Sequence, residues 1–162
     1  MLLLTSTYKK GCYILKYLTL LSVLTLSACS SVQHLPALGE GTIANMNLIA
    51  LSEQSAPQGV SGTFQFYIKT AGSQYGDVFL NTEADYRDRR AITISIDSNV
   101  AAKLTEKYGQ SANTFFIGKT IEVTGEAKRV TIDFLSKGRK TNKYYYQTHV
   151  AVNSINQLRI VE

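Results

Sequence analysis

Cysteine, histidine and proline are scarce in this chain of 162 residues, which contains two of each. The cysteines, Cys12 and Cys29, lie near the N-terminus, and the histidines, His34 and His149, are far apart in the sequence. Both cysteines are accounted for by the N-terminal segment described below, and the two histidines alone cannot assemble a zinc site of the usual cysteine and histidine composition. A G-x-S-x-G sequence is also missing, so a serine triad lacks support. We therefore expect no metal, no cofactor and no catalytic residue.

Acidic residues are absent from the first 28 residues, which carry Lys9, Lys10 and Lys16 before the apolar run 18–26. A cationic start followed by a short apolar stretch is typical of a secretory leader. The apolar run is shorter than the roughly 20 residues that a membrane-spanning helix needs. We predict that residues 1–28 are a signal peptide that is removed.

The end of this leader, Leu26-Ser27-Ala28-Cys29, resembles the lipobox of bacterial lipoproteins. The resemblance implies that the Cys29 sulfur receives a diacylglycerol, so that the mature N-terminus is anchored in a membrane. Ser30 after the cysteine implies a lipoprotein of the bacterial outer membrane that faces the periplasm. The alternative is an ordinary signal sequence with a chance cysteine. A lipidated Cys29 and a removed Cys12 would leave no thiol for a disulfide.

Residues 29–58 show no sustained hydrophobic period and contain both prolines, Pro36 and Pro57. Such a composition is typical of a flexible spacer. We predict a tether over 29–58 and a folded domain over 59–162. The alternative for residues 47–51 (N-L-I-A-L) is a short strand or a turn of helix that packs on the domain.

Hydrophobic alternation in the domain predicts strands at 60–69, 77–81, 92–96, 120–135 and 143–152, with turns at 71–76 and 136–142. Asp97 or Ser98 is the predicted N-cap of a helix that runs to Tyr108 and ends at Gly109. Gly125 predicts a bulge or bend in the long strand. The prediction is a mostly β domain, a five-stranded antiparallel OB-like barrel with one helix between strands three and four.

Two stretches of the domain, 116–125 (F-I-G-K-T-I-E-V-T-G) and 156–161, resemble the end of bacterial OB-fold domains of the nucleic-acid-binding type. The resemblance covers residues 59–162 and describes a barrel strand, not a binding site. The long basic turn that follows this strand departs from the short turn usual in the family. Nucleic acid is therefore a compatible ligand, although a protein that faces the periplasm meets little of it.

A charged segment at 83–90 suggests the carboxylates and arginine of a secreted OB-fold nuclease. The acidic motif that those nucleases carry on an early strand is absent, and mixed charges in a polar connection usually form weak solvated ion pairs. We therefore expect no enzyme. The residues of this segment are Glu83, Asp85, Arg87, Asp88, Arg89 and Arg90.

Basic and aromatic residues gather around the predicted turn between the last two long strands. Cations offset phosphate charge, and aromatic rings stack on bases or sugars. Strand alternation places Tyr145 and His149 on one face and Tyr144 and Tyr146 on the other. The alternative is that the tyrosines pack the hairpin while the lysines keep it soluble and protect an exposed edge. The candidate binding residues are Lys128, Arg129, Lys137, Arg139, Lys140, Lys143, Tyr145 and His149.

The function expected from these features is that of a lipid-anchored, non-catalytic binding module. Its partner is an anionic polymer or a protein of the envelope. The second hypothesis is an assembly or scaffold component of an envelope complex, and the third is an OB-fold nuclease.

Overall fold

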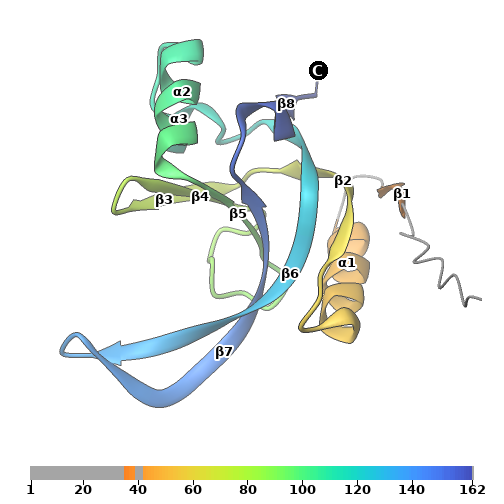
Figure 1. Ribbon diagram of the computed structural model, residues 1–162, viewed down its shortest axis with the longest axis vertical. Coiled ribbons are helices and arrows are strands. Elements are labelled where there is room, and N and C mark those ends of the chain that lie inside the picture. The colour runs from red at the N-terminus through yellow and green to blue at the C-terminus, as the bar shows by residue number, and fades with distance from the viewer. Residues whose placement is uncertain (1–34, 39–41, 162) are drawn as a thin grey trace, which may run out of the picture. The chain divides into compact units, whose positions relative to one another are not determined.

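The computed structural model describes residues 35–38 and 42–161, which are mostly strands with few helices (Figure 1). The predicted signal peptide, the lipobox with Cys29, and His34 lie outside these residues. Within them, no helix is long and apolar enough to cross a bilayer. The elements are β1 (Leu35–Leu38), α1 (Thr42–Ser55), β2 (Val60–Tyr67), β3 (Thr70–Gln74), β4 (Asp77–Asn81), β5 (Ile92–Ile96), α2 (Ser98–Tyr108), α3 (Ala112–Phe115), β6 (Thr120–Ser136), β7 (Arg139–Val152), the 3-10 helix η1 (Ile155–Gln157) and β8 (Leu158–Ile160).

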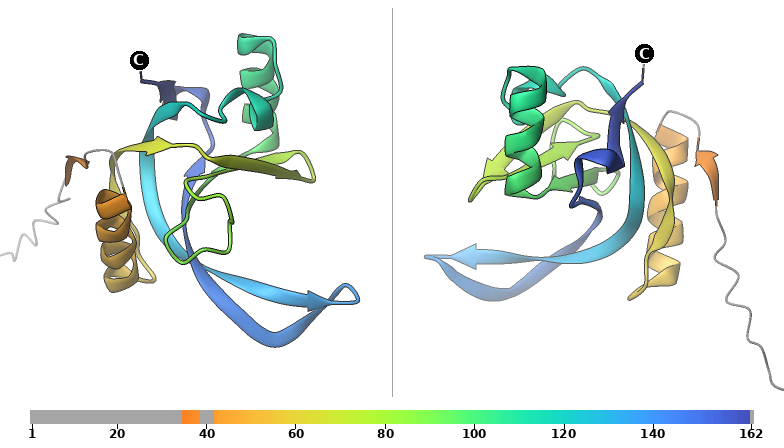
Figure 2. Two further views of the ribbon diagram at one scale, coloured as in Figure 1. Left: turned by 180° about the vertical axis from the view of Figure 1, so that it is seen from behind. Right: turned by 45° about the horizontal axis from the view of Figure 1, so that its top comes forward.

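One sheet joins the strands in the order β1-β2-β6-β7-β5-β4-β3, with β8 paired to β6. Its long members β6 and β7 curve strongly in both views (Figure 2). Only Ile68 and Lys69 separate β2 from β3 along the chain. In the strand order, however, β6, β7, β5 and β4 lie between β2 and β3, so two adjacent segments of the chain pair with strands at different places in the sheet. The Ile68 backbone N–H donates to the Lys119 carbonyl (3.0 Å), and the Lys69 N–H donates to the Asn81 carbonyl (2.9 Å).

The prediction of a mostly β domain is confirmed, and the structure has more strands and helices than the five antiparallel strands and one helix predicted. β3 and β8 are short and lack the alternation of a half-buried strand, and β1 and α1 lie in the predicted tether. Two strand pairs, β1–β2 and β5–β7, are parallel. Parallel pairing joins segments far apart in the sequence, so no local pattern signals it.

Two hairpin turns are tighter than predicted. The turn between β3 and β4 is Tyr75-Gly76, with φ of 54° and 94°, and the turn between β6 and β7 is Lys137-Gly138, with φ of 51° and 76°. Positive φ at both central residues is the geometry of a two-residue hairpin loop, which matches the twist of the flanking strands. β7 therefore begins at Arg139 rather than at Lys143.

The helix α2 forms where the sequence predicts it. The Asp97 side chain accepts a hydrogen bond from the Asn99 N–H, which makes Asp97 the N-cap. Gly109 ends the helix in the left-handed region with φ of 68°, and its N–H donates to the Thr105 carbonyl. Both caps are local signals, which explains why the sequence alone locates this element.

Residues 42–55 of the predicted tether form the helix α1, which packs against the sheet. Leu48 is 1% exposed and Ile49 is 8% exposed, both within the hydrophobic core. The Ser52 hydroxyl lies 3.0 Å from the Thr148 hydroxyl of β7 and donates to the Ile49 carbonyl (2.8 Å). In Figure 1, α1 stands beside β2 and β6.

Gly125 does not mark a bulge, because it pairs in regular register with Gly62 of β2. A Cβ atom at this position would lie 3.1 Å from Val150 Cγ1 and 3.5 Å from the Ala151 carbonyl oxygen. The glycine therefore permits a close approach of β7 to the middle of β6.

If α1 belongs to the folded core, Leu48→Ala should lower the free energy of unfolding by about 2–5 kcal/mol, the usual cost of emptying a buried leucine site. Met46→Ala on the same helix is the matched control, because Met46 is 43% exposed. It should change stability by about 0.5 kcal/mol or less. Urea unfolding measures both, and equal midpoints for the two variants would show that α1 is not part of the cooperative unit.

Candidate functional site

The hairpin of β6 and β7 extends beyond the rest of the sheet (Figures 1 and 2). β6 pairs with β2 as far as Ala127 and with β7 from Ala127 to Ser136. β7 in turn pairs with β5 only over Thr148–Val152. Beyond these points the hairpin is a two-stranded ribbon, and its side chains have no third strand beside them.

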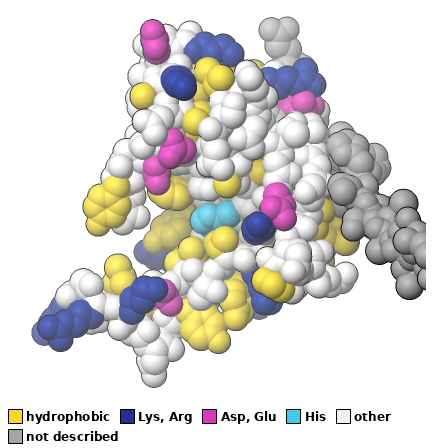
Figure 3. Space-filling model, in the orientation of Figure 1, with side chains coloured by type: hydrophobic (Ala, Val, Ile, Leu, Met, Phe, Trp, Pro, Cys, Tyr) yellow, Lys and Arg dark blue, Asp and Glu magenta, His cyan; other side chains and the backbone are white. Residues whose placement is uncertain are grey.

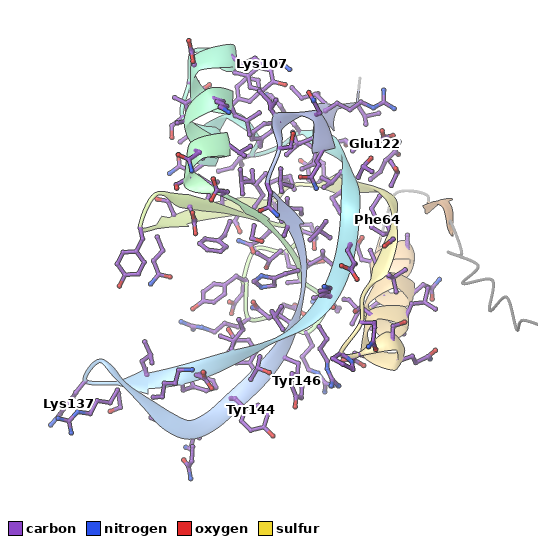
Figure 4. The ribbon with its side chains drawn as sticks, in the orientation of Figure 1. Phe64, Lys107, Glu122, Lys137, Tyr144 and Tyr146 are labelled. Carbon is purple, nitrogen blue, oxygen red and sulfur yellow. The ribbon has the colours of Figure 1, made fainter. Side chains whose placement is uncertain are left out.

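The tip of this ribbon carries the predicted cations Lys137, Arg139, Lys140 and Lys143, all exposed. Figure 3 shows Lys and Arg gathered at this end, and Figure 4 labels Lys137 there. Lys140 forms an ion pair with Asp133 (Nζ to Oδ2, 2.5 Å), and its side chain stays 75% exposed. Such an exposed pair contributes little to stability, so the tip keeps a positive field.

Strand register divides the other candidates between the two faces of the ribbon. Lys128 lies opposite His149, and Arg129 lies opposite Thr148. The Arg129 guanidinium is 4.4 Å from the centre of the Tyr146 ring, whereas Tyr145 lies opposite Ile132 on the other face. The eight candidate residues therefore do not form one surface.

His149 and Lys128 contribute little free positive charge. Burial lowers the pKa of His149 to about 4, so its ring is neutral at neutral pH. Its Nε2 lies 2.9 Å from Gln147 Oε1, and because a carboxamide oxygen only accepts, Nε2 carries the proton. Lys128 forms an ion pair with Glu126 (2.9 Å), and this pairing lowers the pKa of the Glu126 carboxyl.

Of the local ion pairs expected in the segment between β4 and β5, the described residues show Arg90–Asp88 (2.6 Å). Glu83 pairs instead with Lys69, which precedes β3 (2.7 Å). Hydrogen bonds from Arg90 lower the pKa of Asp88 to about 2. Among the residues that the structure describes, Arg87 and Arg89 form no ion pair.

Those two arginines line a cavity of about 440 Å³ at the base of the hairpin, between α1, the β4–β5 segment and the strands β6 and β7. Of its lining, only Arg129 and Tyr145 are predicted from the sequence to bind a ligand. The α1 residues fall in the predicted tether, and Arg87 and Arg89 are predicted to form local ion pairs. The charged and aromatic residues of the lining are Glu53, Arg87, Arg89, Arg129, Phe134, Tyr145 and Tyr146.

Gln147 links two walls of this cavity. Its side chain is buried, and its Nε2 donates to the Tyr86 carbonyl oxygen at 2.5 Å, which ties the β4–β5 segment to β7. Arg87 Nε donates to the Tyr86 hydroxyl (3.1 Å) in the same segment. Over the described ranges, no group of three His, Cys, Asp or Glu side chains is placed to hold a metal ion.

No family model and no curated protein matches this sequence. Among solved structures, the chain is similar to an aspartyl-tRNA synthetase from Entamoeba histolytica, with 12% identity and a TM-score of 0.40 over 68% of this chain and 20% of that one. A protein assigned as an aspartyl-tRNA synthetase from Leishmania major Friedlin gives 14% identity and a TM-score of 0.38 over 68% and 19%. The chain thus spans about a fifth of these proteins. TM-scores of this size carry no argument for a shared function.

The half-buried, neutral His149 predicts a loss of stability in acid. Its pKa is about 4 in the folded state, below the ordinary value of about 6.5, so the unfolded chain binds the extra proton first. Stability should therefore fall as the pH drops from 6.5 towards 4, by on the order of 2 kcal/mol between pH 7 and pH 5.

The measurement is urea unfolding of the wild type and of His149→Gln at both pH values. The variant should lose this pH-dependent share of the free energy of unfolding, while other titrating groups act alike in both proteins. An identical pH dependence in the two proteins would contradict a half-buried, neutral ring.

Proposed function

We propose that this chain is a lipid-anchored lipoprotein of the bacterial envelope, facing the periplasm from the outer membrane, that binds an anionic polymer without catalysing a reaction. The observation that carries the proposal is the exposed cationic tip of the β6–β7 ribbon. Lys137, Arg139 and Lys143 form no ion pair within the described part of the chain. Unpaired exposed cations bind polyanions by releasing the counterions of the polymer.

An OB-like barrel is the fold that we propose for the domain. Residues 60–74 act as one long first strand, in which β2 pairs with β6 and β3 pairs with β4. β4 and β5 are then the second and third strands, α2 lies between the third and the fourth, and β6 and β7 complete the five. The ribbon that we assign to binding is the connection between the last two strands, enlarged into a long hairpin.

The membrane anchor rests on the lipobox-like sequence Leu26-Ser27-Ala28-Cys29. Several acyl chains give stable anchoring, because each buried methylene contributes about 0.8 kcal/mol. Nucleic acid is a compatible polymer by charge and stacking, but the proposed compartment favours other polyanions.

A scaffold role in an envelope protein complex is the second candidate. Phe134 is 45% exposed, Leu135 is 64% exposed and Tyr144 is 56% exposed on the same ribbon. Apolar and aromatic side chains are enriched in protein interfaces.

The hairpin should lose polyanion affinity when its tip is neutralised. In Lys137→Ser/Arg139→Ser/Lys140→Ser/Lys143→Ser, the affinity of the full chain for inorganic polyphosphate should fall roughly tenfold or more, because four cationic contacts are removed. Fluorescence anisotropy with labelled polyphosphate measures the affinity. Undiminished binding would reject the hairpin as the binding surface and leave the scaffold role.

A charge-matched pair separates a local effect from a change in net charge. Lys137→Ser/Lys143→Ser removes two cations from the tip, and Lys103→Ser/Lys107→Ser removes two from α2, at the opposite end of the domain (Figure 4). We expect weaker binding for the first variant and near-wild-type binding for the second. An equal effect of both variants would mean that only net charge matters.

The proposed lipid anchor is tested by examining the modification of Cys29. Protein purified from bacterial membranes should show by mass spectrometry an N-terminal cysteine with a diacylglycerol, and Cys29→Ala should leave the membrane fraction. An unmodified thiol on a freely secreted product would end the lipoprotein proposal.

A further inference from the structure

We propose that the cavity at the base of the hairpin is a second binding site, which takes a small phosphate monoester with a ring or another apolar group beside the phosphate. This site goes beyond the proposed function, because it lies below the cationic tip and requires neither a polymer nor a membrane.

The cavity has a net positive lining. Arg87, Arg89 and Arg129 contribute three positive charges, and Glu53 of α1 contributes one negative charge. None of these four side chains forms an ion pair with another residue of the described ranges. A phosphate monoester carries a charge of about −1.5 to −2 at neutral pH, which matches this lining.

Two of the three guanidinium groups are held in place by aromatic rings. Arg129 lies 4.4 Å from the centre of the Tyr146 ring, and Arg87 lies 5.0 Å from the centre of the Tyr86 ring. Such a contact restricts the rotamers of an exposed arginine. Arg87 also donates its Nε–H to the Tyr86 hydroxyl (3.1 Å), which leaves its terminal N–H groups for a ligand. A planar guanidinium binds phosphate oxygens through two parallel hydrogen bonds, so arginine suits this ligand better than lysine does.

The walls of the cavity are tied to one another by buried polar contacts. Ser52 and Thr148 join α1 to β7 (3.0 Å), and Gln147 joins β7 to the β4–β5 segment through the Tyr86 carbonyl (2.5 Å). Three elements far apart in the sequence therefore hold a fixed arrangement before any ligand arrives. A preformed site avoids part of the entropic cost of binding.

Apolar surface lies beside the charged groups. The rings of Phe134 and Tyr145 are 5.4 Å apart at their centres and contribute to the lining. Tyr145 projects from the face of the ribbon opposite Arg129, so this apolar surface is on the Arg87 side of the cavity. A second hollow of about 410 Å³ shares Arg89 with the cavity and adds Met46 and Ala50 of α1. The volumes fall in the range of small-molecule sites, roughly 300–1,000 Å³. The arginines thus fit the phosphate, and the neighbouring surface fits the group that it is attached to.

In the test, the full chain is titrated separately with phenyl phosphate, inorganic phosphate and phenol, and isothermal titration calorimetry measures the affinity of each. We expect phenyl phosphate to bind roughly tenfold more tightly than either fragment, because it uses both the cationic and the apolar parts of the lining. Arg89→Gln should weaken phenyl phosphate binding by roughly tenfold, through loss of charge-assisted hydrogen bonds.

Glu53→Gln is a second test of the cavity, which does not depend on an arginine variant that folds. This change removes the one acid of the lining, so it should strengthen phenyl phosphate binding about two- to fivefold, the range that one exposed charge supplies. The tip variant Lys137→Ser/Lys143→Ser should bind phenyl phosphate as the wild type does, although it binds polyphosphate less tightly. The binding proposals for the tip and for the cavity can therefore be rejected independently of each other.

Three results would overturn the proposal. The first is phenyl phosphate affinity no greater than that of phenol or phosphate. The second is an unchanged affinity in both Arg89→Gln and Glu53→Gln. The third is binding to vesicles that contain phosphatidylglycerol with no binding of phenyl phosphate, which would make the cavity a lipid contact instead of a soluble-ligand site.

Discussion

The pairing of β6 along its whole length is the constraint on which the rest of this structure depends. Residues 120–127 of β6 pair with β2, of which 121–123 also pair with β8, and β6 pairs with β7 from Ala127 onward. Ile121, Val123 and Ala127 on its inner face are fully buried. Since every backbone group of a buried strand needs a partner, the change of partner near Ala127 fixes where the sheet ends and where the free ribbon begins. The cationic tip and the cavity at the base follow from this one geometric fact.

The distribution of ion pairs decides which cations are available to a ligand. Lys128, Arg90 and Arg159 each have a carboxylate partner, and for Arg159 this is Glu122 at 2.6 Å. Within the described residues, the cations of the cavity and those of the tip apart from Lys140 have no such partner, and Lys103, Lys107 and Lys119 elsewhere have none either. The net charge of this protein is thus a poor guide to anion binding, because many opposite charges neutralise each other in ion pairs. An anion is attracted by the unpaired cations of a local surface.

The sequence predicts local features of the fold well and distant ones poorly. Asp97 and Gly109 define α2 because capping is a matter of neighbouring residues, and alternation locates the buried strands. The sequence predicts turns at 71–76 and 136–142 but not their two-residue form, because neither Tyr75 nor Lys137 is usual at positive φ. α1 escapes it because few of its residues are buried and no regular apolar stripe marks them.

The candidate site was predicted in part for the same reason. The tip lies within one continuous segment, so composition alone points to Lys137, Arg139, Lys140 and Lys143. The cavity is lined by α1, the β4–β5 segment and the hairpin. These segments are far apart in the sequence, and the residue pattern of one segment does not predict that it contacts the others. In the sequence, Arg87 and Arg89 belong to a segment with equal numbers of acidic and basic residues. Only the fold shows that they line the same cavity as Arg129.

The account depends most on electrostatic recognition by the ribbon, and the salt dependence of polyphosphate binding tests this directly. We predict that the logarithm of the association constant falls linearly with the logarithm of salt concentration, with a slope of about −2 to −4 for contacts made by the tip. A slope near zero, with affinity intact at high salt, would contradict the account and indicate a protein or apolar interface instead.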